Sequence, residues 1–190
     1  AITIKGAAVR PGIYAWSTGT RVSSLLRSVK VDLLPTVDLN YALIVREKNP
    51  RLEIAVKQFN LADAILNPGT DLDLALEPRD QLILFELVDI ESRQGERRET
   101  LLEPIIRKLR SQAKQGEPVQ VVSISGAVKA PGEYPLEQGD RAFALVRAAG
   151  GFKDSAFLAA AELRRIIEVV SGSVDLQYSE LSFEAFGQLA

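Results

Sequence analysis

The chain contains no cysteine and no histidine. Their absence excludes thiolate nucleophiles, disulfides, the usual Cys/His zinc sites and the commonest general base. We therefore expect a protein that is not an enzyme and that holds no metal and no cofactor. The lack of cysteine leaves the compartment open, because such a chain is stable in oxidising and reducing surroundings alike.

An excess of charge of one sign and a long apolar run are missing as well. The 23 basic residues are spread along the chain and the formal net charge is −2, so no nucleic-acid partner is expected. No run of about 18 apolar residues could span a bilayer, and no signal-peptide pattern opens the sequence. Methionine is absent and the sequence starts at Ala1, so we expect a segment of a longer protein whose targeting signals lie elsewhere.

The sequence contains one unit written twice. Residues 4–14 align with residues 124–134 at a constant offset of 120. The register continues through further identical pairs, which a chance match of a few residues would not do: Gly19 and Gly139, Arg21 and Arg141, Leu25 and Leu145, Arg27 and Arg147. With 46% hydrophobic residues in 190, the chain can form two small domains, each with its own core.

Each copy is predicted to open with a hairpin and a helix. The strands over 1–9 and 119–128 both end in Pro-Gly, which predicts a type II turn and a returning strand. Apolar spacing predicts one helix over 22–29, with Thr18 or Thr20 as N-cap, and a second over 142–149 behind Asp140. Gly150 and Gly151 are expected to close the second helix.

The rest of the first copy is typical of a small sheet. Strands are predicted over 41–47 and 52–57 with a turn at 48–50, followed by a short helix over 61–66 that ends at 67–69, and by a closing strand over 81–88. The pattern predicts a mixed sheet covered by one main helix.

The second copy matches through 162–170 and 173–177, and its residues 181–186 resemble the short helix at 61–66. It has no counterpart of residues 72–88. The second unit therefore lacks its last strand, either because the segment is truncated, which we favour, or because another segment or a partner chain donates the strand.

A charged stretch lies between the copies. Residues 91–117 carry five aliphatic residues at helical spacing, with Pro104 near the helix start where its missing N–H is tolerated. We predict a connecting helix laid on one of the domains. The expected division is a first domain over 1–88, a helical linker over 89–117 and a second domain over 118–190.

Residues 123–134, followed by Arg141, Leu145 and 148–152, resemble the signature of the SLBB (soluble ligand-binding β-grasp) family. The first copy resembles it through 6–14 and 76–83, and departs from it at 30–35. The resemblance implies an α+β chain with two β-grasp domains. Tandem copies resemble the periplasmic part of bacterial outer-membrane polysaccharide export proteins, which assemble as rings. The expected partners are thus a polysaccharide chain, further copies or other SLBB units, and other envelope export components.

Five residues are candidate ligand contacts. Tyr14, Trp16 and Tyr134 could stack on sugar rings, while Arg10 and Lys129 could hydrogen-bond hydroxyl groups. The alternative is that the two tyrosines are core residues, which we favour because they recur at one place in both copies. Trp16 stays open between the two roles, and the two cations are typical of a solvated surface.

Asp71 and Asp73 stand at strand spacing and could form a pair of catalytic carboxylates for glycoside hydrolysis. No third catalytic element accompanies them, so we interpret them as polar loop residues. The predicted function is a periplasmic structural and ligand-binding module of a polysaccharide (capsule or exopolysaccharide) export protein. The alternative is a protein–protein scaffold domain of a DNA-uptake or secretion apparatus with no glycan contact.

Overall fold

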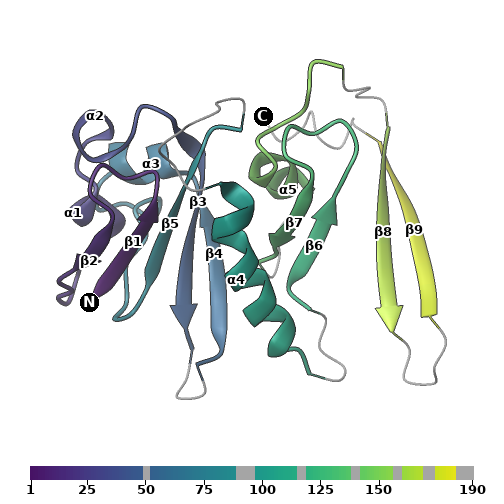
Figure 1. Ribbon diagram of the computed structural model, residues 1–190, viewed down its shortest axis with the longest axis horizontal. Helices are drawn as coiled ribbons and strands as arrows, with labels where there is room; N and C mark the ends of the chain where they lie inside the picture. The colour runs from purple at the N-terminus through teal and green to yellow at the C-terminus, as the bar shows by residue number, and fades with distance from the viewer. Residues whose placement is uncertain are drawn as a thin grey trace.

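The computed structural model describes residues 1–48, 52–88, 97–114, 119–137, 142–155, 160–168 and 174–182, the last two ranges as backbone only. The first repeat forms a five-stranded mixed sheet in the order β2-β1-β5-β3-β4 (Figure 1). Its strands are β1 (Ile2–Gly6), β2 (Gly12–Tyr14), β3 (Val37–Glu47), β4 (Ile54–Phe59) and β5 (Gln81–Glu86). Strand β5 runs parallel to β1 and antiparallel to β3, which confirms the predicted mixed sheet.

The first hairpin forms, but its turn differs from the prediction. Strand β1 ends at Gly6, and Gly12 already lies in β2 with φ +149°, whereas a type II turn needs a glycine φ near +80°. The chain turns away earlier, at Gly6, which has φ +84° and lies close beside Leu84 of the neighbouring strand β5: a Cβ on Gly6 would lie 1.9 Å from the carbonyl oxygen of Leu84. Residues 7–11 then form a wider loop, which Ala8 anchors by a bridge to Leu33.

The predicted single helix over 22–29 is wrong. The structure has two short helices, α1 (Val22–Leu25) and α2 (Val29–Asp32). The break arises because the carboxylate of Asp32 accepts hydrogen bonds from the backbone N–H groups of Arg27 (2.8 Å) and Ser28 (2.9 Å). Thr20 does not cap α1, whose N-cap residue is Arg21.

The expected short helix α3 (Leu61–Leu66) is confirmed, and the side chain of Asn60 caps it by accepting from the N–H of Asp63. Three short helices therefore accompany the sheet instead of one main helix. A first core forms beside them. Its fully buried aliphatic side chains come from β1, β3, β5, α1 and α3, and include Ile4, Val22, Ile44, Leu61 and Leu82.

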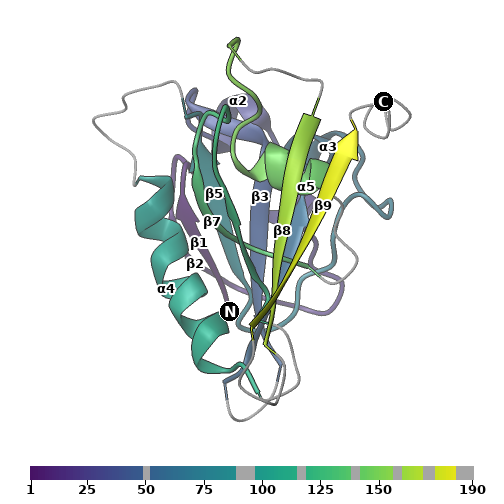
Figure 2. The same cartoon turned by 90° about the vertical axis from the view of Figure 1, so that its right-hand side faces the viewer.

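The other face of the sheet carries a second core that both repeats share. Helix α4 (Arg98–Ser111), the helix expected in the charged stretch, buries its aliphatic stripe there. Buried with it are Tyr41, Leu43 and Phe85 from the first sheet, and Val128, Tyr134, Ala148 and Ala149 from the second repeat. Figure 2 shows α4 along one flank of the molecule, seen from the side of β8 and β9. The division into domains at 88 and 118 stays a prediction.

The described part of the second repeat contains two separate hairpins and one helix. Strands β6 (Val121–Ile124) and β7 (Gly132–Pro135) form one two-stranded sheet, and β8 (Ala160–Glu168) and β9 (Val174–Ser182) form another. Between them, α5 (Ala142–Ala148) ends as predicted, with the N–H of Gly150 bonded to Arg147 O and that of Gly151 to Val146 O. Here too β7 starts at Gly132, whose φ is not positive, so no type II turn forms.

Some of the predicted elements lie partly or wholly outside the described residues. Leu181 and Ser182 end β9 and do not begin the expected helix, and 183–186 lie outside the described residues. Asp140, residues 49 and 50 of the predicted turn, and residues 89–96 and 115–117 of the linker also lie outside them.

The opening hairpins of the two repeats have the same pairing register. The pairs Ile2–Tyr14 and Ile4–Gly12 recur as Val122–Tyr134 and Ile124–Gly132. The loops repeat as well: the bridge between Ala8 and Leu33 recurs between Val128 and Phe152. One hairpin and loop thus occur in both repeats, although among the described residues only the first repeat completes a five-stranded sheet. In the described part of the chain, no helix has the length and hydropathy needed to cross a membrane.

Candidate functional site

A depression of about 380 Å³ lies between the first hairpin and helices α1 and α2. Its walls bring together two of the predicted ligand contacts, Arg10 and Tyr14. Further polar groups come from the helical segment: Ser24, Arg27 and Asp32. The site therefore joins two cations, a carboxylate and a hydroxyl beside an aromatic ring.

The two tyrosines do the same structural work in both repeats. The hydroxyl of Tyr14 donates to the carbonyl of Arg10, and the hydroxyl of Tyr134 donates to the carbonyl of Ala130 at 2.8 Å. In each repeat the tyrosine bonds the carbonyl of the residue four positions earlier and so closes the hairpin loop. Tyr134 is only 2% exposed and packs edge-on against Tyr41, so its ring offers no face to a ligand. Tyr14 is half-buried and packs on the first core.

Trp16 is a packing residue with one polar contact. Its indole N–H donates to the carbonyl of Leu76 at 2.7 Å, and its half-buried ring packs against the first core. The bond ties the segment that follows β2 to the segment that leads into β5. A sugar could reach only the part of the ring that this packing leaves open.

The two cations predicted as ligand contacts differ in surroundings. The side chain of Arg10 is 80% exposed, and its nearest carboxylate is that of Asp32 at 4.0 Å. An exposed cation at that distance is held weakly and is available to a ligand. Lys129 is half-buried, and its backbone N–H bonds to the carbonyl of Gly151. The structure does not bring Lys129 into the depression beside the first hairpin.

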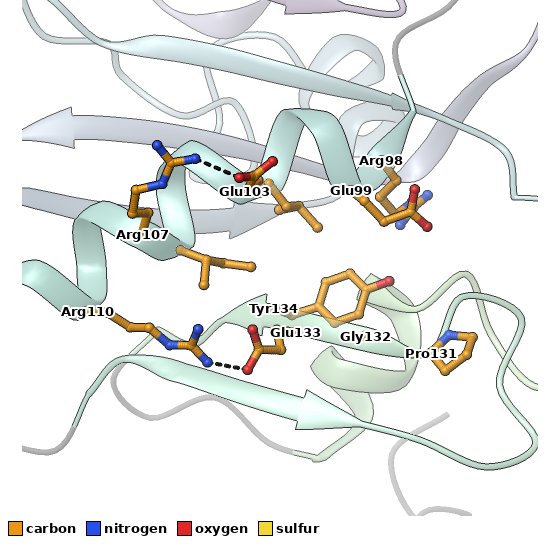
Figure 3. A pocket seen from close by; sticks show the side chains of 11 residues that line it. Arg98, Glu99, Glu103, Arg107, Arg110, Pro131, Gly132, Glu133 and Tyr134 are labelled. Carbon is orange, nitrogen blue, oxygen red and sulfur yellow. Dashed lines mark hydrogen bonds and ion pairs between the residues drawn. The ribbon is translucent and has the colours of Figure 1, made fainter.

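A second depression, of about 420 Å³, lies between α4 and β7 (Figure 3). Leu102, Ile106 and Tyr134 line its apolar part. Two ion pairs lie at its rim: Arg107 pairs with Glu103 along α4 at 2.6 Å, and Arg110 of α4 pairs with Glu133 of β7. Because these cations already have carboxylate partners, the groove is largely self-neutralised.

A buried arginine lies beside this groove and joins the two repeats. The guanidinium of Arg98 pairs with the carboxylate of Asp38 at 2.6 Å and donates to the carbonyls of Glu86 (3.1 Å) and Ala148. It also lies 5.0 Å from the ring centroid of Phe85. Side-chain exposure is 7% for Arg98 and 4% for Asp38. A charge this deeply buried is stable only when it is paired and hydrogen-bonded, as here.

Sequence reasoning missed this cluster. Arg98 stands in a charged stretch, where an arginine is usually solvated. The available signal was its spacing, three and four residues before Leu101 and Leu102, which puts it on the aliphatic stripe of the helix.

Burial raises the pKa of Tyr134 above its ordinary value of 10.0, against the lowering effect of the nearby Arg98 charge. In the first sheet, the hydrogen bond from Arg46 to Asp80 raises the pKa of that guanidinium. Arg46 binds Asp80 through two nitrogens, at 2.9 and 2.7 Å, and Asp80 also accepts from the backbone N–H of Glu77. This network fixes the turn that leads into β5.

Asp71 and Asp73 do not form a carboxylate pair on one strand face. They lie in a turn, where Asp71 is exposed and Asp73 is fully buried. The Asp73 carboxylate accepts hydrogen bonds from the N–H and hydroxyl of Ser23 and from the N–H of Gly69. It holds α1 against the turn, in agreement with the interpretation of both residues as polar loop residues.

Comparison with known families gives a match in the second repeat. Residues 121–174 match the SLBB domain, which is a soluble ligand-binding domain. The match covers β6, β7, α5, β8 and the start of β9. No curated protein and no solved structure matches the chain. An SLBB domain in the second repeat is thus supported, and the mixed α+β architecture of the first repeat fits a β-grasp-like fold.

Proposed function

We propose that this chain is a non-catalytic binding and assembly module of a bacterial polysaccharide export protein, situated in the periplasm and associated with the outer membrane. The observation that carries the proposal is the SLBB match of the second repeat, together with the recurrence of its hairpin and loop in the first. SLBB domains are common in such export proteins.

The depression beside the first hairpin is the proposed contact for the glycan. Arg10 and Arg27 supply guanidinium groups, which form strong paired hydrogen bonds with carboxylates. Asp32 and Ser24 can bond sugar hydroxyls. An acidic glycan that carries uronic acids or other carboxylates fits this set better than a neutral one. The site is open, which suits a chain that moves past it and binds weakly.

Titration with oligosaccharides tests this contact. An acidic oligosaccharide should bind with a dissociation constant in the millimolar range, and a neutral one of equal length should bind more weakly. Changes in NMR chemical shifts during the titration measure both affinities. The double substitution Arg10→Ala/Arg27→Ala should weaken acidic-glycan binding at least tenfold. Arg79→Ala removes a similarly exposed arginine (73%) that does not line the depression and should leave binding unchanged. Equal binding by both variants would refute the proposed site.

Assembly is the second part of the proposal. Copies of this module would contact one another within a ring, and would also contact other SLBB units and other export components. The parent protein should therefore form closed oligomers. Light scattering after size exclusion, performed on the parent protein, measures the subunit number. A strict monomer at all concentrations would contradict the assembly role.

One observation favours the alternative, a scaffold of a DNA-uptake or secretion apparatus without glycan contact. All three predicted aromatic contacts, Tyr14, Trp16 and Tyr134, are engaged in packing and hydrogen bonds within the protein. Under this alternative, oligomers form while no acidic or neutral saccharide shifts any resonance. The two experiments together therefore distinguish the alternatives.

A further inference from the structure

The depression beside the first hairpin carries a set of charges that the second repeat does not share. The residues that line it bring two positive charges, those of Arg10 and Arg27, and one negative charge, that of Asp32. At the constant offset of 120, Arg27 corresponds to Arg147, whereas Arg10 corresponds to Ala130. Only one of the two cations therefore recurs.

The negative charge does not recur either. Leu33 and Phe152 form the equivalent bridges of the two loops. Asp32, which precedes Leu33, therefore corresponds to Gly151. Because a glycine has no side chain, the loop of the second repeat closes without a carboxylate. Arg10 and Asp32 are thus present together in one repeat and absent together in the other, and the fold of the loop requires neither charge.

The two oxygens of Asp32 have different surroundings. Oδ2 accepts the backbone hydrogen bonds from Arg27 and Ser28 that separate α1 from α2. Oδ1 lies 4.0 Å from the guanidinium of Arg10, and the Asp32 side chain is 17% exposed. An amide oxygen can accept the two backbone bonds as a carboxylate does. The local structure therefore needs an acceptor at this position but not a negative charge.

The charge of Asp32 acts on any anion that enters the depression. A ligand that pairs with Arg10 or Arg27 comes close to the Asp32 carboxylate, because all three side chains line the same space. By Coulomb's law each negative charge of the ligand is repelled separately. A group with two negative charges therefore loses twice the binding free energy that a singly charged carboxylate loses, and a neutral hydroxyl group loses none.

We propose that Asp32 is a specificity-determining residue of this depression. Its charge lowers the affinity for doubly charged groups, such as phosphate monoesters, more than the affinity for a sugar residue that carries one carboxylate. Arg10 and Arg27 attract the acidic sugar, and Asp32 limits the charge that each bound sugar residue can carry. This role rests on the proposed glycan contact and deepens it, since it matches the site to uronic acids and not to phosphorylated sugars.

Asp32→Asn tests the role, because it removes the charge and keeps an oxygen for the two backbone bonds. The probes are glucuronate, with one negative charge, and glucose 6-phosphate, which carries two at about pH 8 because the second pKa of a phosphate monoester is about 6. NMR titrations of the whole chain measure both affinities. For a charge removed at about 4–6 Å in a nearly aqueous medium, glucuronate should bind about three- to fivefold more tightly and glucose 6-phosphate about ten- to twentyfold.

Asp154→Asn is the matched control. It removes an equal charge from an exposed residue of the second repeat that does not line the depression, so both affinities should stay unchanged. Circular dichroism checks that both variants fold. Equal gains for the two probes in Asp32→Asn would overturn the proposal, because a Coulombic effect must be larger for the doubly charged probe. A loss of affinity for both would also overturn it, since Asp32 would then orient Arg10 for the ligand.

The same titrations separate the role of Asp32 from the glycan contact itself. If the unmodified chain binds glucuronate and Arg10→Ala/Arg27→Ala weakens this binding while Asp32→Asn changes nothing, the contact stands and the role of Asp32 is overturned. If neither the unmodified chain nor Asp32→Asn binds either probe, the contact and the role are overturned together.

Discussion

At the residue scale, the junction between the repeats depends on one buried ion pair. Arg98→Met leaves the Asp38 carboxylate buried without its partner, which should cost about 3–5 kcal/mol of unfolding free energy. Urea denaturation measures the loss. The exposed pair of Arg107 with Glu103 gives the control, since Arg107→Ala should cost at most about 1 kcal/mol.

A double variant separates the effect of the unpaired Asp38 charge from the effect of losing the hydrogen bonds of Arg98. Replacing both partners, Arg98→Met with Asp38→Leu, removes the buried charges together and should recover most of the lost stability. If the double variant were as unstable as the single one, hydrogen bonding of Arg98 to the carbonyls of Glu86 and Ala148 would be the main contribution.

The raised pKa of Tyr134 predicts a pH dependence at the alkaline end. Burial favours the neutral phenol in the folded state, so the folded protein keeps its proton at a pH where the unfolded chain begins to lose it. The stabilising contribution is complete below about pH 10, the ordinary tyrosine value, and is lost as pH rises through the raised folded-state pKa. Urea midpoints measured across this range should fall with pH less steeply in Tyr134→Phe. The same slope in both proteins would contradict the assignment.

The roles of single residues could be predicted from the sequence where the same residue recurs at the same position of both repeats. Both tyrosines were favoured as core residues from their recurrence, and both hydroxyls close the same loop. Arg98 was missed because its burial depends on Asp38, which is 60 residues away in the sequence. Local composition carries no information about such a distant partner.

At the element scale, the end of α5 offers a test of close packing. A Cβ on Gly150, which has φ +75°, would lie 2.7 Å from Cγ2 of Val88, while Gly151 has open space. Both alanine variants pay a similar cost for positive φ. Gly150→Ala should therefore be less stable than Gly151→Ala by about 1–3 kcal/mol, the usual cost of overpacking. Thermal unfolding of the two variants compares them directly, and equal melting temperatures would show that Val88 moves aside without cost.

Strands and short helices were predictable to within a few residues, but their ends were not. The helix over 22–29 was predicted from apolar spacing, yet the Asp32 side chain competes for backbone N–H groups and divides it. The first Pro-Gly turn was predicted from local preference, yet the chain turns earlier, at Gly6, which lies close beside Leu84 of β5. In both cases a contact made after folding decided the boundary, so the local sequence could not.

At the scale of the whole molecule, the two repeats share a core. One core contains side chains from the face of the first sheet that α4 covers, from the aliphatic side of α4, and from the β6–β7 hairpin. The connecting helix was predicted from the sequence, but each repeat was expected to have a hydrophobic core of its own. A repeat that has no described counterpart of β5 instead covers its hairpin with the neighbouring sheet.

A shared core predicts that the first repeat and α4 unfold together. The chain has a single tryptophan, Trp16, which packs on the first core, whereas Ile106 of α4 packs in the second core on the other face of the sheet. Ile106→Ala should cost about 2–4 kcal/mol through the cavity it leaves and should lower the urea midpoint seen by Trp16 fluorescence. Leu66→Ala, at a side chain 70% exposed on α3, should barely move it. If Ile106→Ala left the tryptophan transition in place while circular dichroism showed an earlier step, the first sheet would be an independent unit, because its stability would then not depend on the helix that covers it.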